Sequence, residues 1–274
     1  MHLNCYDFSG VKVAVQCREK LAESESLQKF ATDCENPDFL ITLEFRETLP
    51  DTPEELDPAA EWHCKKTKIA ADCPEQAFAY TGFRDDNCHM YALERFKDAF
   101  DVGSVFRHAP IHHLLLQKDA IIIHGSYIIV NGEAIIFSAP SGTGKSTQAE
   151  LWRKHRSARI INGDRVLIRR SENGFTAGGI YYSGTSGICE NVTAPIRAIA
   201  LISQARQSTA EKCRGAEAFR RLLRESAYST AFENDPADIA ALLADVVNGV
   251  DIVKLACLPG ESAVKALENY LTER

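Results

Sequence analysis

Ala139-Pro-Ser-Gly-Thr-Gly-Lys-Ser146 follows an apolar run, Ala134-Ile-Ile-Phe137, and precedes a segment with the apolar periodicity of a helix. A glycine-rich turn between a strand and a helix directs successive backbone N–H groups and the helix N-terminus at one point, where they bind phosphate. The lysine of such a loop reaches the outer phosphates, and the next hydroxyl is left for Mg²⁺. The stretch therefore predicts a loop that binds a polyphosphate.

A chance turn rich in Gly, Ser and Thr is the alternative, but strand, loop and helix occur here in the required order. Ala139 stands where the pattern usually has its first glycine, and the rest of the loop is intact. The residues expected to contact the nucleotide are Ser141, Gly142, Thr143, Gly144, Lys145, Ser146 and Thr147.

The surrounding patterns predict an α/β fold with a mixed sheet. Strands over 127–130 and 133–137 are joined by Asn131-Gly132, a strong hairpin signal, whereas a Rossmann-like domain enters its loop from a parallel strand. A second hairpin is expected around Glu172-Asn-Gly174. Further elements are a helix over 147–155, strands over 158–161, 196–202 and 252–258, and helices after Asp235-Pro236 and over 261–271.

The first hundred residues are richer in short β-like runs than the rest of the chain. Short β-like runs occupy 39–45, 64–72, 76–83 and 88–94, with Asp85-Asp-Asn87 as a turn, and a helix is expected from Val105 with Pro110 near its first turn. His108 and His112 have metal-ligand spacing, but no carboxylate or cysteine accompanies them, so they are interpreted as structural. We predict a β-rich accessory or substrate-recognition domain over 1–104 and a P-loop catalytic domain over 105–274.

Net charge, apolar stretches and cysteine usage indicate which classes of partner and which cellular location to expect. The chain has 274 residues, 45% of them hydrophobic, and a net charge of −7, which argues against nucleic-acid binding. Apolar stretches are too short for a membrane helix, so we expect no membrane partner. Nine cysteines, an odd number without a C-x-x-C pair, and an N-terminus unlike a signal peptide favour reduced thiols and a cytoplasmic location.

Asp164, in Ile161-Asn-Gly-Asp-Arg-Val166, lies at a strand end beyond the loop. Phosphoryl transfer needs charge neutralisation and in-line positioning, so a lysine, a metal ion and a carboxylate form the minimum set. Asp164 could hold Mg²⁺ together with Ser146, or accept the proton of an incoming hydroxyl. The alternative is a turn aspartate beside Gly163.

The order of His124-Gly125, hairpin, Ser141-Gly-Thr-Gly-Lys-Ser-Thr147, helix and Ile161-Asn-Gly-Asp-Arg-Val166 resembles the catalytic domain of HPr kinase/phosphorylase and related serine or peptide kinases. Around the loop it also resembles ATP-dependent phosphoenolpyruvate carboxykinase. The resemblance implies a mixed-sheet P-loop fold with ATP and Mg²⁺ as cofactors, and His124 matches the family histidine beside the loop. Where the family has two adjacent aspartates, this chain has Gly163-Asp164, so either Asp164 serves alone or another acid such as Glu190 completes the site.

The leading hypothesis is a kinase that transfers the γ-phosphate of ATP to a serine-type hydroxyl of a peptide, protein or small molecule. Lys145 would clamp the phosphates, Asp164 or Glu190 would act as base, and His124 would support them. A nucleotide-binding sensor or scaffold without catalysis is the second hypothesis. A phosphoenolpyruvate carboxykinase-type reaction is the third, but no His/Lys pair is placed for the second metal it needs. Self-association, reversibility and the acceptor stay open.

Overall fold

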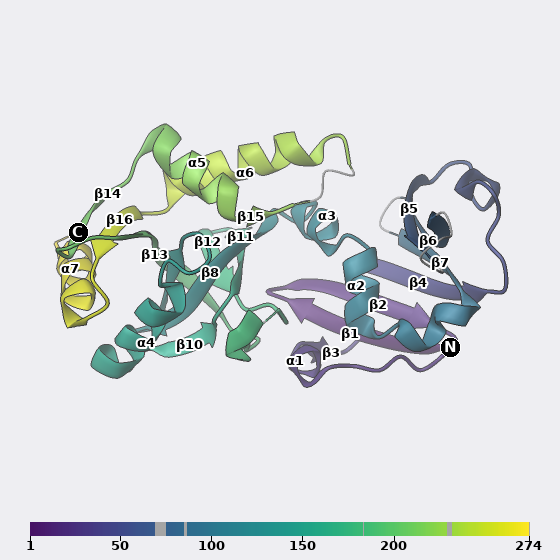
Figure 1. Ribbon diagram of the computed structural model, residues 1–274, viewed down its shortest axis with the longest axis horizontal. Helices are drawn as coiled ribbons and strands as arrows, with labels where there is room; N and C mark the ends of the chain where they lie inside the picture. The colour runs from purple at the N-terminus through teal and green to yellow at the C-terminus, as the bar shows by residue number, and fades with distance from the viewer. Residues whose placement is uncertain (69–74, 85–86, 183, 229–231, 274) are drawn as a thin grey trace. The chain divides into compact units, whose positions relative to one another are not determined.

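In the computed structural model, the described residues are 1–68, 75–84, 87–182, 184–228 and 232–273. The chain divides into two compact units, Met1–Leu114 and Leu115–Arg274. Each unit contains a mixed β-sheet and several helices, so the architecture is α/β, as predicted (Figure 1).

The first unit is built on a sheet of seven strands in the order β3-β1-β2-β4-β7-β6-β5. β4 pairs in parallel with β2 and β7, and the other neighbours are antiparallel. The strands are β1 (His2–Phe8), β2 (Val11–Cys17), β3 (Ala31–Thr32), β4 (Phe39–Arg46), β5 (Glu61–Lys68), β6 (Glu75–Arg84) and β7 (Asn87–Leu93). The helices are α1 (Glu25–Gln28), η1 (Pro53–Glu55), η2 (Glu94–Ala99) and α2 (Val102–His108).

The helix expected from Val105 is two short helices, α2 and α3 (Ile111–Leu116). They separate because Pro110 has no N–H and disfavours helical backbone at Ala109, whose ψ is 111°. α2 belongs to the first unit, since the ring centroid of Phe106 lies 5.5 Å from that of Tyr6 and 5.7 Å from that of Phe8. The units therefore divide after Leu114 instead of after residue 104.

The second unit has a sheet of nine strands, in which β8 and β13 each pair with different strands along their length. β8 pairs with β11 through its first half and with β9 through its second half, and β13 pairs in parallel with β9 and β16. The strands are β8 (Ala120–Val130), β9 (Glu133–Ser138), β10 (Arg159–Asn162), β11 (Arg165–Ser171), β12 (Gly174–Gly178), β13 (Thr193–Gln204), β14 (Thr209–Lys212), β15 (Ser226–Ala227) and β16 (Ile252–Cys257). The helices are α4 (Lys145–Arg156), η3 (Gly184–Ser186), α5 (Gly215–Glu225), α6 (Asp235–Gly249) and α7 (Glu261–Thr272).

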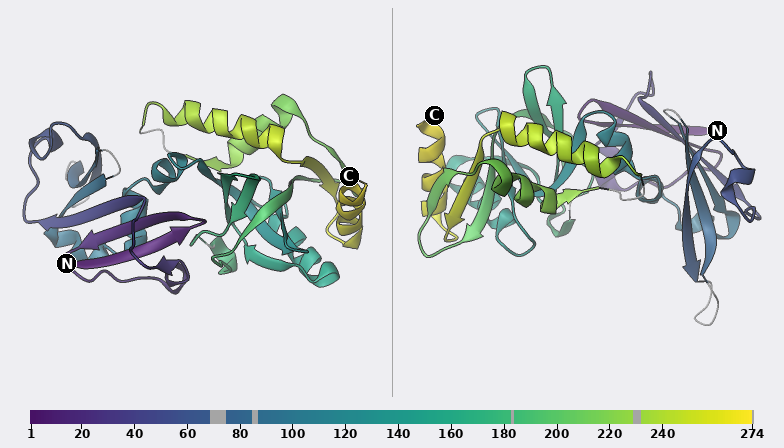
Figure 2. Two further views of the ribbon diagram at one scale, coloured as in Figure 1. Left: turned by 180° about the vertical axis from the view of Figure 1, so that it is seen from behind. Right: turned by 90° about the horizontal axis from the view of Figure 1, so that it is seen from above.

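Helices cover both faces of this sheet. Successive side chains of a strand point to opposite faces, and Ile135 and Phe137 accordingly pack with α4 and α7, while Ile136 packs with α5 and α6. Figures 1 and 2 show α5 and α6 together along one face. The apolar runs at 120–123 in β8, 134–137 in β9 and 198–202 in β13 follow from this two-sided burial.

The β8–β9 hairpin is confirmed, and it positions the site. Asn131 and Gly132 have φ values of 52° and 83°, as a two-residue turn with left-handed backbone requires. The register places Gly125 opposite Ser138, and the Ser138 hydroxyl donates to the His124 carbonyl oxygen at 3.0 Å. His124 is thereby fixed beside the end of β9, where the phosphate loop begins.

Some expectations fall outside the described residues: part of the run 64–72, and Asp85 and Asp86 of the turn before Asn87. The eight cysteines within the described ranges form no disulfide. No helix in the described part of the chain is both long and apolar enough to span a bilayer.

Candidate active site

The segment between β9 and α4 has the backbone of a phosphate loop. Gly142 and Gly144 have φ values of 77° and 118°, in the left-handed region that favours glycine, and Gly144 is the N-cap of α4. The methyl group of Ala139 packs in the apolar core with Ala149 and Trp152, which explains how alanine replaces the usual first glycine.

Lys145 is held at this loop. Its side chain is buried, and Nζ donates to the carbonyl oxygens of Ala139 at 2.8 Å and Pro140 at 3.3 Å. Burial lowers the pKa of Lys145 below its usual range, whereas the carboxylates of Glu225 and Asp164 act in the opposite direction. The loop thus holds a cation whose hydrogen bonds are made to neutral carbonyl groups.

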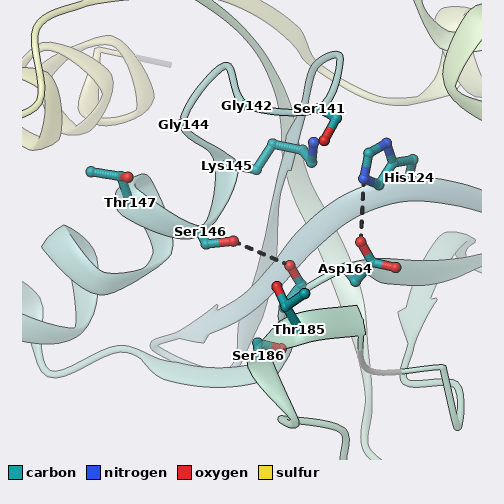
Figure 3. Close-up of a pocket in the computed structure, with 11 residues that line it drawn as sticks. His124, Ser141, Gly142, Gly144, Lys145, Ser146, Thr147, Asp164, Thr185 and Ser186 are labelled. Atoms are coloured by element: carbon teal, nitrogen blue, oxygen red, sulfur yellow. Dashed lines mark hydrogen bonds and ion pairs between the residues drawn. The ribbon is translucent and has the colours of Figure 1, made fainter.

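A cavity of about 280 Å³ opens beside the loop. It is lined by His124 of β8, the loop with the first residues of α4, the Gly163-Asp164 turn, and Thr185 and Ser186 of η3. Figure 3 shows His124, Asp164, Lys145 and Ser146 directed toward this common space. The structure therefore brings eight of the residues singled out in the sequence to one cavity: His124, Ser141, Gly142, Gly144, Lys145, Ser146, Thr147 and Asp164.

His124 lies between two carboxylates. Its Nε2 is 3.3 Å from Oδ1 of Asp164, and its Nδ1 is 3.2 Å from Oε2 of Glu225. Asp164 also contacts the guanidinium of Arg165, with Nε 3.4 Å from Oδ2. Glu225 is nearly buried, with 9% of its side chain exposed, whereas Asp164 is 30% exposed toward the cavity. The Asp164 carboxylate is therefore open to a ligand. The His124 ring orients it, and the Glu225 carboxylate in turn holds that ring.

Asn162 builds the turn that carries Asp164. Its fully buried amide accepts hydrogen bonds from the backbone N–H groups of Asp164 and Arg165, both at 2.9 Å. The same amide donates to the carbonyl oxygens of Ile180 at 2.7 Å and Tyr182 at 2.8 Å. One side chain therefore ties the turn to the segment that leads into η3.

We expect Asn162→Leu to destabilise the second unit by about 3 kcal/mol, because it leaves several buried backbone groups without partners. Asn162→Asp retains the acceptor oxygen but not the two donated hydrogen bonds, and should also be destabilising. Urea unfolding of the full chain, followed by Trp152 fluorescence in a Trp62→Phe background, measures the change. A loss below 1 kcal/mol for Asn162→Leu would contradict this role for the amide.

The glycine before Asp164 is explained by η3. A Cβ atom on Gly163 would lie 2.2 Å from Oγ and 2.6 Å from Cβ of Ser186. Ser186 therefore occupies the space that a side chain at position 163 needs, and a second aspartate there would displace η3. The packing of Ser186 against Gly163 thus explains why this turn carries one carboxylate, at position 164, and not two.

Glu190 lies elsewhere. It forms an ion pair with Arg159 at the sheet edge and is not among the described residues that line the cavity. The second acid beside His124 is Glu225, at the end of α5, which the sequence did not reveal. β15 pairs with β8 and brings Glu225 to His124 across 101 residues, so no local spacing could have marked it.

The donor set suits Mg²⁺ held mainly by a substrate. No group of three or more His, Cys, Asp or Glu side chains within the described ranges is arranged to bind a metal ion. Mg²⁺ in nucleotide sites commonly uses one or two protein oxygens, with phosphate and water completing its shell. Ser146 and Asp164 line the same cavity and offer a hydroxyl and a carboxylate for this purpose.

Comparisons with known proteins give little further guidance. No family model matches the sequence, and no curated protein matches it. The HPr(Ser) kinase/phosphatase from Coxiella burnetii is similar to part of the structure, with 8% identity, coverage of 56% of this chain and 97% of that chain, and a TM-score of 0.32. This is a weak structural similarity.

Proposed function

We propose that this protein is an ATP- and Mg²⁺-dependent kinase that transfers the γ-phosphate to a serine-type hydroxyl of a peptide, protein or small molecule. One observation carries the proposal: a phosphate loop with its lysine lines the same cavity as an open carboxylate paired to a histidine. The resemblance of the motifs between His124 and Val166 to HPr kinase-like enzymes agrees with it. A cytoplasmic location, without nucleic-acid or membrane partners, belongs to the same proposal.

The loop residues act on the phosphates. Backbone N–H groups of the loop and of the start of α4 would bind the phosphates, and the Lys145 ammonium would neutralise charge on the outer phosphates. Ser146 and Asp164 would hold Mg²⁺, which when bound neutralises phosphate charge. Lys145 would exchange its bonds to the Ala139 and Pro140 carbonyl oxygens for bonds to phosphate oxygens.

The Asp164–His124–Glu225 chain acts on the acceptor. A carboxylate within hydrogen-bond reach of a hydroxyl can orient it and accept its proton as the new P–O bond forms. His124 fixes the Asp164 carboxylate through Nε2, and Glu225 fixes the ring through Nδ1. Glu225 does not line the cavity, so we regard it as a positioning residue.

Glu225→Gln should lower kcat about tenfold, because His124 loses the carboxylate that orients its ring, while KM for ATP changes little. Glu190→Gln is the matched control. Its carboxylate pairs with Arg159 away from the cavity, so kcat should stay within twofold of the unmodified protein. Steady-state kinetics of the two variants distinguish the acids, and the reverse ranking would contradict the assignment.

Transfer of label from [γ-³²P]ATP tests the function itself. The protein with Mg²⁺ is incubated with free serine, with serine-containing peptides and with water alone as acceptor, and phosphoserine is sought in the products. Magnesium-dependent phosphoserine formation is the expected result. Saturable ATP binding without transfer to any hydroxyl or to water would contradict the kinase and favour the nucleotide sensor.

A further inference from the structure

A second cavity lies on the other side of the phosphate loop. Its volume is about 400 Å³, within the range of small-ligand sites. It shares Gly142, Gly144 and Thr147 with the cavity at Asp164, so both cavities border the same loop. A ligand whose phosphates lie on the loop and whose outer phosphate lies at Asp164 would extend its other end into this second cavity.

The second cavity contains an unsatisfied polar atom. Gln148 of α4 lines it and is 2% exposed, and its Oε1 is buried with no hydrogen-bond partner among the described residues. The amide Nε2 donates to Sγ of Cys257 at 3.3 Å, so the partner of the amide group is bonded to Nε2 and not to Oε1. A buried acceptor without a donor is costly, and a ligand that carries an N–H group would remove that cost.

Part of the lining is apolar. Ala205, Cys257, Leu258 and Pro259 contribute to it, at the ends of β13 and β16, where Gln204 adds a polar, uncharged side chain. Leu258 is one of the few large hydrophobic side chains exposed in the described part of the second unit, with 46% of its surface accessible. Burial raises the pKa of the Cys257 thiol, which therefore remains neutral. An uncharged wall beside an amide acceptor fits a flat aromatic base that carries an amino group.

We infer that this cavity is the nucleobase subsite of the nucleotide and that Gln148 accepts a hydrogen bond from the amino group of adenine, with Leu258 against the ring. The inference rests on the proposed function, since it takes the loop to hold the phosphates of the same molecule. It adds the residues that select the adenine base.

The test compares affinities for Mg·ATP, for magnesium tripolyphosphate and for the triphosphate of purine riboside, which lacks the amino group. We expect the unmodified protein to bind ATP about fivefold more tightly than the purine riboside triphosphate, the value of one hydrogen bond. Gln148→Met conserves the volume of the side chain. This variant should bind ATP and the purine riboside triphosphate with equal affinity, and its affinity for tripolyphosphate should equal that of the unmodified protein.

Leu258→Ala provides a second variant, because its exposed side chain can be removed without harm to the fold. It should weaken ATP binding three- to tenfold, roughly the value of the lost apolar contact, and leave tripolyphosphate binding unchanged. Leu3→Ala is the matched control, since Leu3 is 47% exposed and lies in the first unit. Its affinities should equal those of the unmodified protein.

The outcomes separate the subsite from the phosphate loop. If both variants bind ATP as the unmodified protein does, or lose ATP and tripolyphosphate affinity equally, the nucleobase subsite is wrong and the loop assignment stands. If the unmodified protein binds neither ATP nor tripolyphosphate, the proposed function fails and the subsite fails with it.

Discussion

Lys145→Met is expected to lower kcat/KM for ATP-dependent transfer about 10³-fold, the loss that follows removal of a donor aimed at developing charge. Lys145 is the buried cation at the loop, and Met conserves most of its volume, so the loss would be one of charge and hydrogen bonding. Steady-state kinetics measure the change, and Trp152 fluorescence in a Trp62→Phe background checks that α4 is intact.

Lys154→Met is the matched control, because Lys154 is exposed on the same helix, and its kinetics should stay within twofold of those of the unmodified protein.

Burial lowers the pKa of Lys145, so the ligand-free protein loses this positive charge at a lower pH than an ordinary lysine does. ATP affinity should be highest below that pKa and fall as the pH rises through it. Lys145→Arg keeps its charge and should remove this alkaline decline. Activity of Lys145→Met within tenfold of the unmodified protein would contradict the role of the lysine.

Asp164→Asn should lower kcat by about 10²- to 10³-fold, because the amide can neither accept the proton of a hydroxyl nor supply negative charge to Mg²⁺. The substitution conserves shape, and the ion pairs it removes, with His124 and Arg165, are partly exposed and contribute little to stability. Rapid-quench kinetics with saturating Mg·ATP would report the chemical step directly.

Asp245→Asn is the control for this variant, because Asp245 is an exposed carboxylate paired with Arg170 at 2.5 Å. We expect its kcat to equal that of the unmodified protein. If Asp164→Asn retained more than a tenth of the kcat, Asp164 would be a turn residue that caps the strand end, and the catalytic assignment would be wrong.

The fold around the loop could be predicted because its signals are local. Asn131-Gly132 specifies a turn that only left-handed backbone satisfies, and the apolar run of β9 and the helical periodicity of α4 are recognised within a few residues. The β1–β2 hairpin was not predicted, although Ser9 and Gly10 form a two-residue turn with φ values of 56° and 83°. The pairing of β8 with four different strands depends on contacts distant in sequence, which no local pattern reports.

In the candidate site too, local motifs could be predicted, whereas contacts between residues distant in sequence could not. Lys145, Ser146 and Asp164 lie in or near one motif, and the structure places them on one cavity. Glu225 and Asn162 act through contacts that form only in the folded chain: Glu225 reaches His124 from α5, and Asn162 joins two loops. The sequence left Glu190 as a possible second acid, and its pairing with Arg159 depends on where β10 lies in the folded chain.

Calorimetric titration of the full chain with Mg·ATP tests the central claim most directly, namely that the loop at Lys145 holds a magnesium-bound polyphosphate. We predict saturable binding of one ATP per chain, weakened at least tenfold by Lys145→Met and unaffected by Lys154→Met. The absence of saturable binding at millimolar Mg·ATP, or equal affinity in Lys145→Met, would contradict it.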